Sequence, residues 1–158
     1  MSEKTYNVLF LCTRNTARSI MAEAILNRLG QGRFIAFSAG SKPADAIHPY
    51  TTDLMKLMNY TLEGAKPKGL DAITEEMDFV FSVCDETSLD DCPATWGLPM
   101  TANWAVPDPV NVTGTEAERR LAFSEAYRML NNRIDIFVNL PLSLDKEKLQ
   151  TQLDHIGN

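Results

Sequence analysis

One stretch of the chain combines a nucleophile with a turn suited to binding an anion. Cys12 follows the apolar run Val8–Leu11, and Arg18 and Ser19 stand six and seven residues later, where a helix-like segment begins. A tight loop between a strand and a helix presents several backbone N–H groups to one anion, and the helix N-terminus adds partial positive charge. A thiol at the start of such a loop and a guanidinium at its end predict an anion-binding nucleophile.

The chemistry expected of this loop depends on the ionisation of Cys12. A free cysteine with a pKa of about 8.5 is only a few per cent thiolate at neutral pH, whereas a pKa of roughly 6 would make it mostly thiolate. Inward-pointing amides, the helix N-terminus and Arg18 would each lower the pKa, and the Ser19 hydroxyl could donate to the sulfur. The same donors, with Arg18 as a bidentate fork, would hold a tetrahedral oxyanion. The expected binding residues are Arg18, Ser19 and the loop residues Thr13, Arg14, Asn15, Thr16 and Ala17.

Two more cysteines follow, Cys84 after the expected buried strand Asp78–Val83 and Cys92 after a short acidic stretch. The cytoplasm keeps thiols reduced, so a disulfide among three cysteines would be transient rather than structural. The spacing from Cys84 to Cys92 does not fit a zinc knuckle, and His48 and His155 follow no ligand pattern, so no metal site is predicted. The alternatives are plain burial for Cys12 and a solvated acidic loop between two unrelated thiols for the others.

Length and composition limit the class of protein. The 158 residues are expected to form a single domain over 1–158, with a polar C-terminal extension from about 143. The net charge of −6, with scattered basic residues, argues against a nucleic-acid partner. No apolar run approaches the roughly 20 residues that span a bilayer, and the N-terminus has no signal-like core. A cytoplasmic monomer is therefore expected, without membrane association.

Strands and helices are expected to alternate along the chain. Hydrophobic patterns predict four strands, at Tyr6–Leu11, Arg33–Ser38, Asp78–Val83 and Met100–Trp104. They also predict a helix at Ser19–Leu29, a second from Pro49 to near Asn59, and a short one within Ser143–Asn158. The longest helix is expected to begin at a capping box, Thr115–Glu118, and to end at Pro141. This order implies a parallel sheet covered on both faces, with ligands at the carboxyl ends of the strands. Cys12 and Cys84 both fall at such ends, so they could be neighbours in space.

The Cys-x5-Arg-Ser motif after a first strand resembles the low-molecular-weight tyrosine phosphatase superfamily. The resemblance extends over nearly the whole chain, to Asn15, to Ser38-Ala39-Gly40 and to Asp108-Pro109. Within the superfamily, the chain is most similar to the thioredoxin-coupled arsenate reductases, because of Cys84, Cys92 and the passage 101–109. The implied fold is an α/β, flavodoxin-like three-layer sandwich with a four-stranded parallel sheet flanked by helices.

The resemblance implies a disulfide relay that reduces arsenate to arsenite. Cys12 would attack arsenate, Cys84 would then attack the Cys12 sulfur, and Cys92 would attack Cys84 and pass the disulfide to an external reductant. That reductant would be the thioredoxin system or a similar thiol carrier, with no bound cofactor. Phosphate and sulfate would compete with arsenate for the loop.

Asp108 has two interpretations. An aspartate between two prolines usually marks a plain turn. The resemblance implies instead a general acid that protonates the leaving oxygen, help worth about 10² to 10⁴ in rate. We favour the acid.

Arg14 and Ala17 depart from the residues usual in relatives, glycine and cysteine respectively. Arg14 needs a compatible backbone angle, and we hypothesise that its charge aids oxyanion capture. The unusual Arg14 motivates a third function, an inactive oxyanion-binding protein, which the intact motif residues disfavour.

A phosphomonoesterase, in particular a tyrosine phosphatase, is the main alternative activity, since it would use the same Cys12 and Asp108. Tyrosine phosphatases of this superfamily carry aromatic residues after Asp-Pro, where this chain has Val110-Asn111-Val112. The two spaced cysteines also favour reduction.

Overall fold

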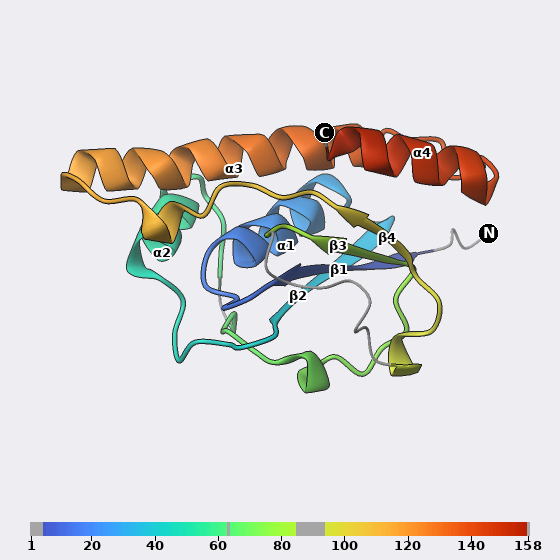
Figure 1. Cartoon of the computed structure of the whole chain (residues 1–158), viewed down its shortest axis with the longest axis horizontal. Helices are drawn as coiled ribbons and strands as arrows, with labels where there is room; N and C mark the ends of the chain where they lie inside the picture. Colours follow the sequence, from blue (N-terminus) through green and yellow to red (C-terminus); the bar gives the residue numbers. More distant parts are fainter. Residues whose placement is uncertain (1–4, 63, 85–93, 158) are drawn as a thin grey trace.

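A four-stranded parallel sheet forms the centre of the structure (Figure 1). The computed structural model describes residues 5–62, 64–84 and 94–157. The strands pair in the order β2-β1-β3-β4, and their bounds are Tyr6–Cys12 for β1, Phe34–Gly40 for β2, Phe79–Ser82 for β3 and Met100–Asn103 for β4. All three neighbouring pairs are parallel, so the predicted α/β fold is confirmed.

In the described ranges, four α-helices accompany the sheet: α1 at Arg18–Leu29, α2 at Pro49–Leu57, α3 at Glu116–Val138 and α4 at Lys146–Ile156. The predicted capping box is confirmed: the Glu118 N–H donates to the Thr115 hydroxyl, and the Thr115 N–H donates to the Glu118 carboxylate. None of the helices in the described ranges is long and apolar enough to cross a membrane.

The two faces of the sheet are covered differently. Val8 and Phe10 of β1 point into the larger core, which α1, α3 and α4 complete, whereas Leu9 and Leu11 point to the opposite face. Along the described chain, that second face is covered by Ile73, Met77 and Trp96, next to the short 3-10 turns Leu70–Ala72 and Ala94–Trp96. Both faces are buried, which explains why β1 is a continuous apolar run instead of an alternating one.

The polar C-terminal segment is integrated into this core. Its helix α4 buries Leu149, Leu153 and Ile156, which recur at helical spacing along one face. Trp104, which follows β4, donates its indole N–H to the Leu153 carbonyl at 2.9 Å. The segment from 143 therefore covers the β4 side of the sheet.

Candidate active site

The loop between β1 and α1 lies at the carboxyl end of the sheet and is held from outside by the segment after β2. The backbone carbonyls of Cys12, Thr13, Arg14 and Thr16 accept hydrogen bonds from the backbone N–H groups of Ser41, Lys42, Ala44 and His48 at 2.8–3.3 Å. Because a trans peptide points its carbonyl and its N–H in opposite directions, outward carbonyls turn the next N–H groups inward. The loop therefore directs several amide donors toward the space in front of Cys12.

Close packing of this loop depends on Gly40 at the end of β2. A Cβ atom at Gly40 would lie 2.5 Å from the Thr13 carbonyl oxygen, nearer than any side chain can approach. The Ser38-Ala39-Gly40 sequence thus lets the loop lie directly against the sheet edge.

Asn15 stabilises the turn inside the loop. Its φ of 57° lies in the left-handed region, where asparagine is better tolerated than most residues. Its fully buried side chain accepts from the Lys68 N–H at 3.0 Å and donates to the Ser19 Oγ at 2.7 Å. The Ser19 oxygen is thereby used as an acceptor, which leaves its own proton available for a neighbouring group. Arg14, by contrast, does not need a positive φ.

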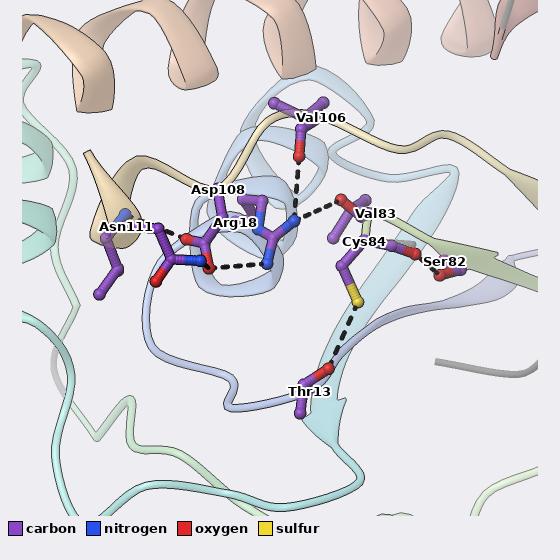
Figure 2. Close-up of polar contacts among 9 residues, drawn as sticks. Thr13, Arg18, Ser82, Val83, Cys84, Val106, Asp108 and Asn111 are labelled. Atoms are coloured by element: carbon purple, nitrogen blue, oxygen red, sulfur yellow. Dashed lines mark hydrogen bonds and ion pairs between the residues drawn. The ribbon is translucent and has the colours of Figure 1, made fainter. Parts of the chain in front are cut away.

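The two thiols that the structure describes lie together. Cys12 and Cys84 are 5% and 1% exposed and share a hydrogen bond, so the prediction that they are neighbours is confirmed. Thr13 places its hydroxyl 3.7 Å from the Cys84 sulfur, and Ser82 donates to the Cys84 carbonyl at 2.6 Å (Figure 2). Cys92 lies outside the described residues.

The Cys12 thiol does not have the lowered pKa that was expected from the loop. The hydrogen bond with Cys84 and then burial raise the pKa of Cys12, and the Arg18 charge and the Thr13 N–H only partly oppose this. The sequence indicated that Cys84 could lie beside Cys12, but not that the hydrogen bond between the two thiols would be the largest influence on the pKa of Cys12. In the ligand-free protein, Cys12 is held as a thiol.

Replacing Cys84 with alanine is expected to lower the pKa of Cys12, because its largest raising contribution disappears. Alkylation of Cys12 by iodoacetamide, followed by mass spectrometry of the Cys12 peptide, should show a midpoint of the rate against pH at lower pH than in wild type. A uniform rise at every pH would indicate better access alone and would contradict this account.

Arg18 connects the loop to two other strand ends. Its Nη1 donates to the Val106 carbonyl at 3.0 Å and contacts the Val83 carbonyl at 3.5 Å, and its Nη2 lies 3.3 Å from the Asp108 Oδ2 (Figure 2). These contacts hold the buried guanidinium in one orientation, with its remaining donors available toward the loop.

Asp108 fits both interpretations made from the sequence. It begins the short 3-10 turn Pro109–Asn111, with its Oδ1 accepting from the Val110 N–H at 3.0 Å. Its Oδ2 accepts from the Asn111 amide at 3.2 Å and pairs with Arg18. The turn therefore also aims a carboxylate at Arg18 and the loop between β1 and α1.

These groups surround one open cavity of about 760 Å³. Cys12 and Arg18 form part of its lining, Asp108 and Asn111 lie on one side, and Arg14 and Lys42 add positive charge. No aromatic side chain is among its described lining residues, as the Val110-Asn111-Val112 sequence had suggested. The cavity suits a small, highly charged anion better than an aromatic ester.

A polar cluster behind the loop was not found from the sequence. Ser38 donates to Glu23 at 2.7 Å, and the Lys68 ammonium lies 3.3 Å from the Ser38 hydroxyl. Burial raises the pKa of Glu23, and the Ser38 hydroxyl and the Lys68 charge oppose that rise. Because the Lys68 backbone also bonds Asn15 and Gly40, this cluster supports the loop from behind. In the sequence, only the position of Ser38, two residues before Gly40, could have indicated this cluster.

Comparison with known proteins gives a consistent assignment. The chain is 29% identical to an arsenate reductase of Oceanobacillus iheyensis over 138 residues, which are 87% of this chain and 96% of the relative. It is 28% identical to an arsenate reductase of Bacillus subtilis over 82% of this chain and 93% of the relative. The crystal structure of an arsenate reductase from Archaeoglobus fulgidus superposes with a TM-score of 0.65 at 27% identity, covering 84% of this chain and 99% of that one. The family model for low molecular weight phosphotyrosine protein phosphatases matches residues 7–151, and the chain belongs to that family.

Proposed function

We propose that this protein is an enzyme that reduces arsenate to arsenite by attack of Cys12 on the bound oxyanion. The observation that carries the proposal is the second buried thiol, Cys84, in hydrogen-bond contact with Cys12. A phosphatase of this family needs one nucleophilic cysteine, whereas reduction needs two electrons, which a pair of thiols supplies when it becomes a disulfide. The arsenate reductases among the relatives support the same activity.

Arsenate would bind with its oxygens toward the inward amides of the loop and the free donors of Arg18. Such preorganised donors stabilise the charge that develops on the oxygens during attack. Arg18 is kept in position by the Val106 carbonyl, so little rearrangement is needed when the oxyanion enters. Ser19, whose oxygen accepts from Asn15, would donate its proton to the Cys12 sulfur.

In the first chemical step, the Cys12 sulfur forms a bond to arsenic and one arsenic–oxygen bond breaks. The departing oxygen leaves as water, so it must collect protons. The Cys12 thiol loses its proton on attack, and Asp108 faces the cavity as the acid for the leaving oxygen.

In the second step, the Cys84 sulfur attacks the Cys12 sulfur. A Cys12–Cys84 disulfide forms, the sulfur–arsenic bond breaks, and its electron pair stays on arsenic, which leaves as arsenite. Cys92 would then attack Cys84, free Cys12 and carry the disulfide to an external thiol reductant, which we propose to be of the thioredoxin class. This cycle fits a compartment that keeps thiols reduced, such as the cytoplasm.

The test is arsenate turnover with thioredoxin, thioredoxin reductase and NADPH, read as arsenite formed. Wild type should turn over repeatedly, and the Cys84→Ser variant should form less than one equivalent of arsenite while still binding phosphate. Phosphate binding by this variant shows that the loop is intact. A Cys84→Ser variant that turns over at the wild-type rate would contradict the proposal.

A further inference from the structure

The Asp108 carboxylate and any oxyanion that binds in the cavity would both contact the Arg18 guanidinium. Because the Nη1 of Arg18 is engaged by the Val106 and Val83 carbonyls, an oxyanion must use the donors that remain. One of the remaining donor atoms, the Arg18 Nη2, already lies 3.3 Å from the Asp108 Oδ2 (Figure 2). Asp108 and the bound anion are therefore neighbours on one guanidinium.

The Asp108 carboxylate is also restrained in this position. Its Oδ1 accepts from the Val110 N–H and its Oδ2 from the Asn111 amide, at 3.0 and 3.2 Å. Its side chain is 29% exposed, so solvent screens it only in part. A carboxylate held in this way cannot easily turn away from a second negative charge.

Two anions side by side in a partly buried cavity repel each other unless a proton lies between them. Arsenate and phosphate retain at least one proton at neutral pH and can donate that O–H to a carboxylate. Sulfate has no proton at neutral pH and can only accept. The same cavity should therefore bind two tetrahedral anions of similar size with different affinities.

We propose that Asp108 is a specificity-determining residue that selects protonated oxyanions, such as arsenate and phosphate, and rejects sulfate. The proposal rests on the proposed function, since it names the chemical form of the oxyanion that the same site accepts. Sulfate is then a much weaker competitor than the loop alone suggests. The shared proton also lies beside the oxygen that must leave as water, so selection and acid catalysis use one hydrogen bond.

Charged groups from other elements also act on Asp108. Arg18 of α1 faces it directly, and His48, at the start of α2, interacts with it electrostatically. Burial and the Arg119 charge of α3 lower the pKa of His48, and the Asp108 charge partly opposes this. Arg14, Lys42 and Asp45 also line the cavity and contribute to its local field.

Asp45 provides the matched control. It lines the same cavity and carries the same charge, but Asp108 is the carboxylate that pairs with Arg18. We would titrate reduced wild type, Asp108→Asn and Asp45→Asn with inorganic phosphate and with sulfate by calorimetry. At pH 7, wild type and Asp45→Asn should bind phosphate at least roughly tenfold more tightly than sulfate, the factor given by one pKa unit of interaction. Asp108→Asn should bind the two within about threefold, through tighter sulfate binding.

Equal wild-type affinities for phosphate and sulfate at pH 7, or selectivity retained in Asp108→Asn, would overturn the inference. Neither titration involves reduction, so a failed arsenate assay and a failed selectivity assay are separate results.

Discussion

Replacing Cys92 with serine is expected to lower steady-state arsenate turnover more than about a hundredfold while leaving one turnover intact. Cys12 and Cys84 are in contact, so the first disulfide can still form and one arsenite can leave. Both cysteines are almost fully buried, at 5% and 1% residue exposure, so an external thiol should reach that disulfide slowly. The protein should stall as a Cys12–Cys84 disulfide, found by mass spectrometry of non-reduced peptides, with one equivalent of arsenite.

The Cys84→Ser variant is the control for this experiment, because it lacks the second electron pair and should release less than one equivalent. If Cys92→Ser turned over as fast as wild type, the external reductant would have to attack the inner disulfide directly. The relay through Cys92 would then be wrong, although arsenate reduction by Cys12 and Cys84 would stand.

Replacing Arg18 with lysine is expected to lower kcat/KM for arsenate by roughly 10² to 10³, the usual effect of losing a preorganised donor to a developing oxyanion. Lysine keeps the positive charge but lacks the planar guanidinium group, which can donate two parallel hydrogen bonds to one anion. It cannot contact the Val106 carbonyl and the Asp108 carboxylate while also presenting donors to the anion. Phosphate affinity, measured by calorimetry on the reduced protein, should fall as well.

Arg14 provides the matched control, because it lies in the same cavity but its exposed side chain is not part of this set of contacts. Arg14→Lys should change kcat/KM only a few-fold, as expected for a solvent-screened charge at the entrance. Thermal unfolding of both variants separates binding from stability. If the Arg18→Lys protein is folded and reduces arsenate at the wild-type rate, the Arg18 guanidinium is not the oxyanion ligand.

Much of the fold could be predicted from the sequence because the relevant signals are local. The apolar run before Cys12 predicted β1, the capping box at Thr115 predicted the start of α3, and Gly30 predicted the end of α1. The alternation of strands and helices then indicated a parallel sheet, whose carboxyl ends must lie at one edge. The spacing of Cys12 and Arg18 predicted the anion-binding loop, since a short loop and one helical turn determine where those residues lie.

The contacts that decide the chemistry join residues far apart in the chain, and only the tertiary structure places them. The register of β1 against β3 brings Cys84 to Cys12, and their shared proton reverses the expected pKa shift of Cys12. The hydrogen bond between Lys68 and Asn15 joins residues 53 positions apart in the sequence, and the one between Arg18 and Val106 joins residues 88 positions apart. Residue types and spacing thus predicted an oxyanion loop with a nucleophile. Packing decided which thiol, carboxylate and cation face it, because burial and proximity set proton affinities that no local pattern encodes.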